Sequence, residues 1–230
     1  MRYDAVIFDL GNTLVSYYGP DEWPAVLDEC IGQVASHLRD RGLWAGELAG
    51  LSERVAAERP TPEDHAVVPL EDRLIRIFQL DGDRLDADVL PAACRRFMRP
   101  IFARARPHDD VLPLLDRLGE QGYRTGIVSN IPWGGPAILW REELDRHRLL
   151  AAVHAVVFCR DAGFRKPARQ PFDLVLRALG TRPDRSLFVG DDPRWDLAGP
   201  RAIGMDAVLV DRTGRNPDAI HRLDELLDRL

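Results

Sequence analysis

The sequence predicts an α/β fold: a Rossmann-like, three-layer core built on a parallel sheet, with an inserted all-helical cap domain. The first observation is a set of short segments that are apolar throughout, typical of buried parallel strands. These segments are residues 5–8, 125–128, 155–158, 187–189 and 207–210. The second observation is their spacing, because helical patterns separate them. The third is that residues 9–124, between the first two, are far too many for an ordinary crossover.

Three helices of the core are marked by capping residues. Asp109 and Asp110 can cap a helix over 109–119. Pro171 can open a second helix, which Gly180 closes, and Pro200 suits the first turn of a third. Alternation of these helices with the strands favours an open parallel sheet.

The long insertion contains amphipathic helical patterns and no convincing strand. The expected helices cover residues 22–41, 45–59, 70–80 and 87–99, with turns at 60–62 and 81–83. We therefore predict a core domain formed by residues 1–16 and 104–230, and a helical cap domain formed by residues 17–103.

Composition narrows the class of protein. The chain has 230 residues, of which 45% are apolar, enough for one large domain or a domain with an insertion. Its 31 basic and 37 acidic side chains give a net charge of −6, which disfavours nucleic acid as the partner. No apolar run is long enough for a membrane span, and no signal peptide is expected. Three widely spaced cysteines favour a reducing cytoplasm. The oligomeric state is open between monomer and homodimer.

Polar side chains follow three of the predicted strands. Asp9 follows the first, Ser129-Asn130 the second, and Asp191-Asp192 the strand at 187–189. Ligands of open α/β sheets bind outside the carboxyl ends of the strands, so these residues are expected to meet in one crevice. Any one of them alone is better explained as a helix N-cap. The three together, with Lys166 before a proline, favour a site.

These residue types fit phosphoryl transfer. Asp9 and Asp191 are hard oxygen ligands that suit Mg²⁺. Lys166 can neutralise one phosphoryl oxygen, and the Ser129 hydroxyl can donate a hydrogen bond to another. The sequence therefore favours a phosphorylated small molecule as substrate and Mg²⁺ as cofactor.

Four segments resemble, in order, the motifs of the haloacid dehalogenase-like hydrolases. They are FDLGNTL at 8–14, VSN at 128–130, GFRKP at 163–167 and VGDDPRWD at 189–196. The resemblance covers the whole sheet domain, and the place of the insertion is similar to that of the family's helical cap of the first type.

The resemblance implies an aspartyl-phosphate mechanism with Asp9 as nucleophile, and with Ser129 and Lys166 holding the phosphoryl group. Asp191 would be a metal ligand, and Asp196 would support the metal or Lys166. The full set of expected metal ligands is Asp9, the backbone carbonyl of Gly11, Asp191, Asp192 and Asp196. The expected substrate-binding residues are Gly11, Asn12, Thr13, Asn130 and Arg165.

Position 11 departs from the family's pattern. Most phosphatases that the chain resembles carry a second aspartate there, which protonates the leaving oxygen, whereas this chain has Gly11. The substrate could have a leaving group that needs little protonation, a cap residue or Asp192 could stand in, or turnover could be lost. The expected function is a Mg²⁺-dependent phosphatase of a small organophosphate, such as a sugar phosphate. The alternatives are a haloacid dehalogenase-type hydrolase and a non-catalytic binding protein with the same fold.

Tyr17 and Tyr18 lie where the chain leaves the core for the cap, a position typical of hinge or pocket-wall residues. Trp195 lies inside the last motif and Trp133 follows Ser129-Asn130 closely; for both, a buried loop anchor is favoured over stacking on a substrate ring.

Overall fold

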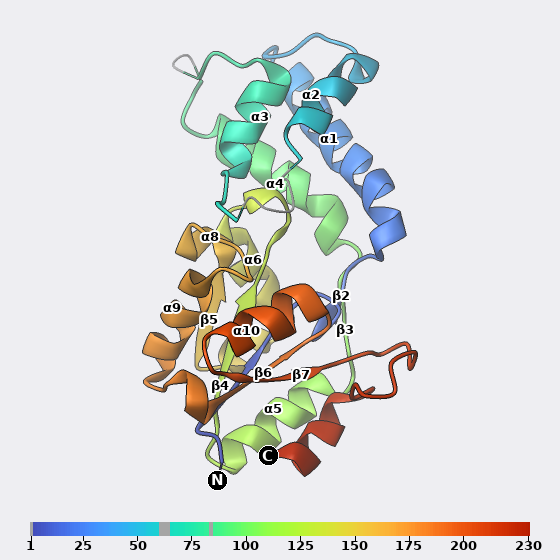
Figure 1. Ribbon diagram of the computed structural model, residues 1–230. Coiled ribbons are helices and arrows are strands. Elements are labelled where there is room, and N and C mark those ends of the chain that lie inside the picture. The colour runs from blue at the N-terminus through green and yellow to red at the C-terminus, as the bar shows by residue number, and fades with distance from the viewer. Residues whose placement is uncertain (1, 60–64, 83–84) are drawn as a thin grey trace.

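A five-stranded parallel sheet forms the centre of the computed structural model, which describes residues 2–59, 65–82 and 85–230 (Figure 1). Its strand order is β5-β4-β1-β6-β7, and every neighbouring pair is parallel. The strands are β1 (Ala5–Phe8), β4 (Arg124–Ser129), β5 (Ala155–Phe158), β6 (Ser186–Gly190) and β7 (Asp206–Leu209). The predicted α/β class and its five strands are confirmed, because each strand end lies within one residue of its predicted position.

Helices cover both faces of the sheet, which explains why its central strands β1, β4 and β6 are mostly apolar and almost wholly buried. On one face, Ile7 and Phe188 pack against Phe172 and Val175 of α9 (Arg169–Leu179). The other face, which includes Phe8, contributes to the larger apolar cluster together with α5 (Val111–Glu120) and the C-terminal 3₁₀ segment η7 (Leu223–Arg229). The result is the three-layer arrangement expected from the sequence.

Two expected helix starts differ in the structure. Asp110 occupies the N-cap position of α5 without making a side-chain cap bond. Its buried carboxylate accepts instead from both terminal nitrogens of Arg212, each at 3.0 Å, and from the Leu223 N–H at 2.8 Å. Helix α9 begins at Arg169, before Pro171, and ends as predicted at Gly180, whose φ of 60° suits glycine.

The insertion forms a helical body beyond the carboxyl edge of the sheet (Figure 1). It is reached through the antiparallel pair β2 (Val15–Ser16) and β3 (Arg106–Pro107). Its segments are η1 (Pro20–Glu22), α1 (Trp23–Asp40), η2 (Leu48–Leu51), α2 (Ser52–Ala57), α3 (Leu70–Phe78) and α4 (Val89–Phe102). The helix predicted over 45–59 is wrong in extent, since a 3₁₀ turn precedes a short α-helix there. The turn predicted at 60–62, and residue 83 of the other turn, lie outside the described residues.

A short main-chain contact attaches the insertion to the core. The Val67 N–H donates to the Gly163 carbonyl at 2.9 Å, and the Arg165 N–H donates to the His65 carbonyl at 2.8 Å. These bonds flank an antiparallel bridge between Ala66 and Phe164. The loop that leads into Lys166 is therefore bonded to the inserted segment.

The remaining elements connect the sheet strands. They are η4 (Pro132–Gly134), α6 (Ala137–Arg146), α7 (Leu149–Ala152), α8 (Cys159–Ala162), η5 (Pro183–Arg185), η6 (Pro193–Ala198) and α10 (Gly199–Ala202). Pro200 lies in the first turn of α10, as expected.

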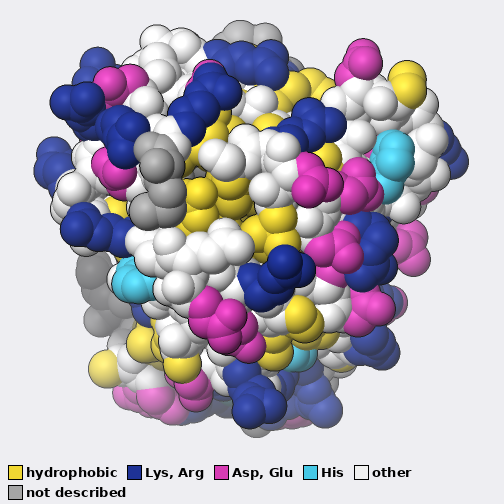
Figure 2. Space-filling view, turned by 90° about the horizontal axis from the view of Figure 1, so that it is seen from below, with side chains coloured by type: hydrophobic (Ala, Val, Ile, Leu, Met, Phe, Trp, Pro, Cys, Tyr) yellow, Lys and Arg dark blue, Asp and Glu magenta, His cyan; other side chains and the backbone are white. Residues whose placement is uncertain are grey.

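In the view of Figure 2, acidic and basic side chains intermingle around patches of exposed apolar atoms. Cys30, Cys94 and Cys159 are buried and unpaired with one another. Within the described ranges, no helix has both the length and the apolar character needed to cross a membrane.

Candidate functional site

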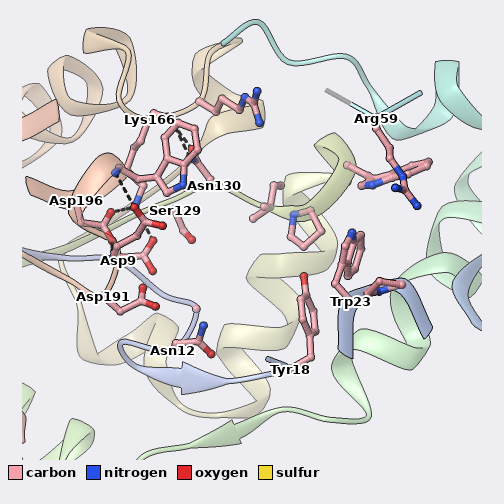
Figure 3. Close-up of a pocket in the computed structure, with 18 residues that line it drawn as sticks. Asp9, Asn12, Tyr18, Trp23, Arg59, Ser129, Asn130, Lys166, Asp191 and Asp196 are labelled. Atoms are coloured by element: carbon pink, nitrogen blue, oxygen red, sulfur yellow. Dashed lines mark hydrogen bonds and ion pairs between the residues drawn. The ribbon is translucent and has the colours of Figure 1, made fainter. Parts of the chain in front are cut away.

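The carboxyl ends of three neighbouring strands bring the predicted motif residues together. Asp9 follows β1, Ser129 ends β4, and Asp191 follows β6. Because β1 lies between the other two strands, these residues line one cavity of about 660 Å³. The Asp9 N–H donates to the Val189 carbonyl at 2.9 Å, which continues the sheet bonding one residue further. Figure 3 shows the acidic residues, Ser129 and Lys166 on one side of the cavity.

Lys166 lies at the centre of the polar cluster. Its Nζ is 2.5 Å from Asp9 Oδ1 and 2.7 Å from Asp196 Oδ1 (Figure 3). Burial alone would lower the pKa of this fully buried lysine, but Asp196 and Asp9 raise it above its ordinary value. Lys166 is therefore a permanent cation that orients the carboxylate of Asp9.

Asn130 fixes the backbone of Lys166. Its Oδ1 accepts from the Lys166 N–H at 2.7 Å, and its Nδ2 donates to the Lys166 carbonyl at 3.1 Å. We predicted that Asn130 contacts substrate, and it does line the cavity. However, both polar ends of its side chain are engaged by the lysine, so its task in the structure is positioning.

Three carboxylates share this small volume with one lysine. Asp9, Asp191 and Asp196 each offer an oxygen within 4.8 Å of the others. Burial, followed by the charges of Asp9 and Asp196, raises the pKa of Asp191 to about 7. Burial also raises the pKa of Asp196 to about 6, although Lys166 opposes the rise. The cluster therefore carries an excess of negative charge that one lysine does not offset.

The donor set fits Mg²⁺, because buried carboxylate oxygens are the hard ligands this ion prefers. Asp9 and Asp191 are better placed as direct ligands than Asp196. One oxygen of Asp196 bonds Lys166, and the other accepts from the Asp192 N–H at 3.0 Å. Asp196 thus holds Lys166 and the turn that follows β6.

Gly190 makes this arrangement possible. A Cβ at residue 190 would lie 2.4 Å from the carboxyl group of Asp196, closer than any real contact. Only glycine lets the end of β6 approach the buried carboxylate, so the glycine before Asp191 has a steric purpose.

Asp192 does not join the three clustered carboxylates in the described part of the chain. Its Oδ1 accepts from the N–H groups of Arg194 and Trp195, at 2.8 and 3.1 Å. The carboxylate therefore caps the helical turn that follows, although Asp192 lines the cavity. Asp192 is thus an N-cap in this structure, and its role as a metal ligand stays a prediction.

The loop after Asp9 places Gly11 and Asn12 at the cavity. Asn12 has a φ of 57°, a left-handed conformation that asparagine tolerates, and its side chain bonds Asp191. Thr13 is fully buried and is not part of the described cavity lining; its Oγ1 donates to Asp191 Oδ1 at 3.5 Å. The structure therefore places Thr13 beside Asp191 and outside the described cavity lining, and its contact with substrate stays a prediction.

The inserted helices and the motif loops form the opposite wall. Tyr18 and Trp23 are stacked with ring centroids 5.0 Å apart, and both line the cavity, as does Arg59 (Figure 3). Arg165 also lines the cavity, with its guanidinium 5.6 Å from the Trp195 ring. Tyr18 was expected at the pocket wall, whereas Trp23 and Arg59 were missed. No motif marks them, because their place depends on how the inserted helices pack on the core.

The fold and the site together define a capped α/β enzyme with a carboxylate–lysine centre. The family model described as "Hydrolase: haloacid dehalogenase-like hydrolase" matches residues 3–204, and the chain belongs to this family.

Individual relatives and structures agree with this assignment. The chain is 30% identical to a glyceraldehyde 3-phosphate phosphatase of Methanopyrus kandleri, over 96% of this chain and 89% of that protein. It superposes on a 2-haloacid dehalogenase of Pseudomonas syringae with a TM-score of 0.69 at 22% identity, covering 99% of both chains. It superposes on a haloacid dehalogenase-like phosphatase of Thermococcus onnurineus with a TM-score of 0.65 at 23% identity, covering 98% and 97%. These two structures share the fold.

Proposed function

We propose that this hydrolase is a Mg²⁺-dependent phosphoric monoester hydrolase that acts through an aspartyl-phosphate formed on Asp9. One observation carries the proposal: Lys166 bridges Asp9 and Asp196 within a buried cluster of three carboxylates. A substrate phosphate would add further negative charge, so the cluster needs a divalent cation to bind it. The family match and the phosphatase from M. kandleri support the same chemistry.

The chain's own residues supply the steps. The lysine holds one oxygen of Asp9 at 2.5 Å, which leaves the other free to attack phosphorus. The Ser129 hydroxyl and the Lys166 ammonium are placed to hold phosphoryl oxygens as the bond to the leaving oxygen breaks. Asp9, Asp191 and the carbonyl of Gly11 would hold Mg²⁺, which would supply positive charge to offset that of the phosphoryl group.

The far wall sets the substrate class. Aromatic rings of Tyr18 and Trp23 and the cation of Arg59 face the polar cluster across the cavity. A cavity of about 660 Å³ admits a small organophosphate with a polar body, such as a sugar phosphate. The M. kandleri relative is named for a substrate of this kind.

A dehalogenase has the same fold, as the P. syringae structure shows. Displacement of a halide from carbon requires no divalent cation, however. Without a cation, Lys166 alone would face the three carboxylates of Asp9, Asp191 and Asp196, which leaves an excess of negative charge beside the nucleophile. We therefore favour the phosphatase over the dehalogenase, and over a protein that only binds its ligand.

The test uses purified protein, 4-nitrophenyl phosphate and Mg²⁺ or EDTA. We expect Mg²⁺-dependent phosphate release by the natural protein and its loss in Asp9→Asn. The matched control is Asp218→Asn, which changes an exposed aspartate outside the described cavity lining and is expected to keep full activity. Phosphate release by Asp9→Asn would remove Asp9 as nucleophile, and chloride release from 2-chloropropionate without Mg²⁺ would favour the dehalogenase.

A further inference from the structure

A second, much smaller cavity lies beside Gly11. Its volume is about 100 Å³, and it shares Gly11, Asn12, Ser129 and Asn130 with the main cavity. It is therefore a side compartment of the candidate active site. A Cβ at residue 11 would meet no atom within 4 Å, so glycine leaves space at the place where a larger side chain would stand.

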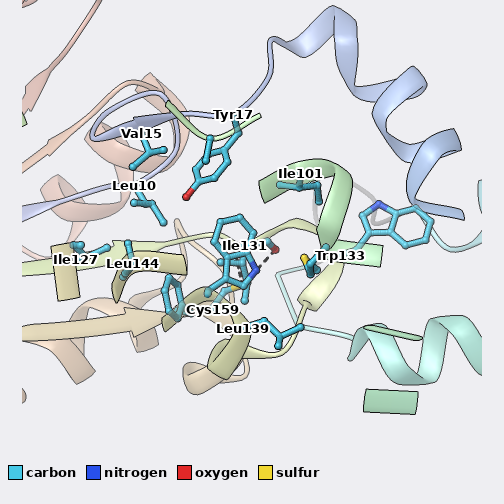
Figure 4. Close-up of a cluster of buried hydrophobic side chains, with 14 of the residues drawn as sticks. Leu10, Val15, Tyr17, Ile101, Ile127, Ile131, Trp133, Leu139, Leu144 and Cys159 are labelled. Carbon is cyan, nitrogen blue, oxygen red and sulfur yellow. Dashed lines mark hydrogen bonds between the residues drawn. The ribbon is translucent and has the colours of Figure 1, made fainter. Parts of the chain in front are cut away.

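Two buried hydrogen-bond donors line this compartment. Tyr17 and Trp140 are only 7% and 3% exposed, and their rings pack edge to face with centroids 5.4 Å apart. The Tyr17 hydroxyl and Trp140 Nε1 have no hydrogen-bond partner within the described ranges. In Figure 4 the Tyr17 side chain reaches toward Leu10 with its hydroxyl turned into the interior. Buried polar groups of this kind are normally satisfied, often by an ordered water.

The local charge determines what these donors bind. Burial, and then the negative charges of Glu143 and Asp9, raise the pKa of the Tyr17 hydroxyl above its ordinary value. The hydroxyl thus stays protonated and is itself a poor acid. The same negative charges disfavour an anion as the resting ligand of this compartment. A neutral oxygen acceptor fits best, and 100 Å³ is room for about three water molecules.

We propose that Tyr17 and Trp140 hold a water molecule beside Gly11, and that this water supplies the proton which the missing acid at position 11 would give. The proposal rests on the phosphatase function proposed above. Tyr17 and Trp140 act through the water, so they are positioning residues.

One water molecule supplies both the proton for the leaving oxygen and the hydroxide for the second step. As the Asp9 oxygen–phosphorus bond forms and the ester oxygen–phosphorus bond breaks, the water gives a proton to the leaving oxygen and becomes hydroxide. The alcohol departs. The hydroxide then attacks phosphorus, the Asp9 oxygen–phosphorus bond breaks, and inorganic phosphate leaves with Asp9 again a carboxylate. No further co-reactant is required.

The test compares two substrates that differ in their leaving group. 4-Nitrophenyl phosphate has a leaving oxygen that needs little protonation, whereas glyceraldehyde 3-phosphate has an alkoxide that needs a proton. We expect Tyr17→Phe to lower kcat for glyceraldehyde 3-phosphate about tenfold or more. With 4-nitrophenyl phosphate, the rate of the initial nitrophenol burst, which reports phosphorylation of Asp9, should change less than about twofold, because this leaving group needs no proton donor. Trp140→Phe should show the same pattern. Tyr123→Phe, a buried tyrosine just before β4 at the far end of the sheet, is the control and should change neither rate.

The Gly11→Asp variant distinguishes a role of Tyr17 in positioning the water from a role in packing. In Gly11→Asp the new carboxyl group takes over the proton transfer, so adding Tyr17→Phe should then change kcat less than about twofold. An equal loss with both substrates, or the same loss in the Gly11→Asp background, would overturn the proposal in favour of a packing role. An unchanged kcat of Tyr17→Phe for glyceraldehyde 3-phosphate would overturn the proposal as well. If the natural protein hydrolyses neither phosphate with Mg²⁺, the proposed function itself fails, and the inference with it.

Discussion

Replacing Asp191 with asparagine should stabilise the metal-free protein at high pH while removing its response to Mg²⁺. The pKa of Asp191 rises from 3.8 to about 7 in the folded chain, because the carboxyl group is buried beside Asp9 and Asp196. A group whose pKa is higher in the folded state favours folding at low pH. That contribution is complete below about pH 4 and is lost as the pH rises through about 7.

The magnitude follows from the same shift. One pKa unit corresponds to about 1.4 kcal/mol, so ionised Asp191 destabilises the folded chain by at most about 4 kcal/mol. Most of that develops between pH 5 and 8, and partial contact with solvent reduces it. The free energy of unfolding of Asp191→Asn minus that of the natural protein should therefore be about 2 kcal/mol larger at pH 8 than at pH 5.

Urea unfolding in EDTA at pH 5 and pH 8 measures this difference, with Asp218→Asn as the exposed control. Added Mg²⁺ should stabilise the natural protein at pH 8 by about 2.7 kcal/mol when its concentration is 100 times the dissociation constant. The variant should gain almost nothing. A stability difference that does not change with pH would refute the electrostatic reasoning, and an intact response to Mg²⁺ would refute Asp191 as a ligand.

Three further changes test other parts of the site and the fold. Gly11→Asp should raise phosphate release from glyceraldehyde 3-phosphate about 10- to 100-fold, because the position is open and the aspartate adds a general acid; equal rates would mean that the proton already has an efficient source. Asn130→Ala should lower kcat about tenfold with little change in the urea midpoint, because Lys166 loses the two bonds that hold its backbone; a midpoint that falls in parallel would indicate a structural role. Arg212→Ala should lower the free energy of unfolding by about 3 kcal/mol, since it leaves Asp110 buried without its ion pair. Burial tends to raise the pKa of Asp110, but the ion pair with Arg212 lowers it below its ordinary value. The stabilisation by this pair is therefore present at neutral pH and is lost as the pH falls below about 4. In an acid titration followed by circular dichroism, the stabilities of the natural protein and the variant should become equal at that pH.

The sheet could be predicted because its central strands β1, β4 and β6 are almost wholly buried and therefore carry an apolar signature. The polar residues at the strand ends could be predicted for a related reason. Parallel strands bring their carboxyl ends to one edge, so Asp9, Ser129 and Asp191 had to be neighbours once the strands were placed. Local sequence determined both features.

Other features depend on packing that local sequence does not carry. The pair β2–β3 joins two-residue strands from opposite ends of the insertion, which leave no pattern to read. The helix expected over 45–59 is interrupted because Gly50 weakens it and its apolar side chains follow the packing of neighbouring helices. Asp110 looked like a helix cap, but Arg212, distant in sequence, offers a stronger partner. Trp23 and Arg59 reach the cavity only because of where the inserted helices rest on the core.

The hydrogen bonds described above between residues 65–67 and 163–165 join peptide groups. Every residue except proline has the same peptide N–H and C=O groups, so these hydrogen bonds can form whichever side chains the positions carry. Substitutions at residues 65–67 and 163–165 are therefore compatible with the contact. Residues of the inserted helices that line the cavity, such as Trp23, can therefore be exchanged while these main-chain bonds to the loop of Lys166 persist. Substrate preference could then change without loss of the main-chain contact that connects the insertion to the loop of Lys166.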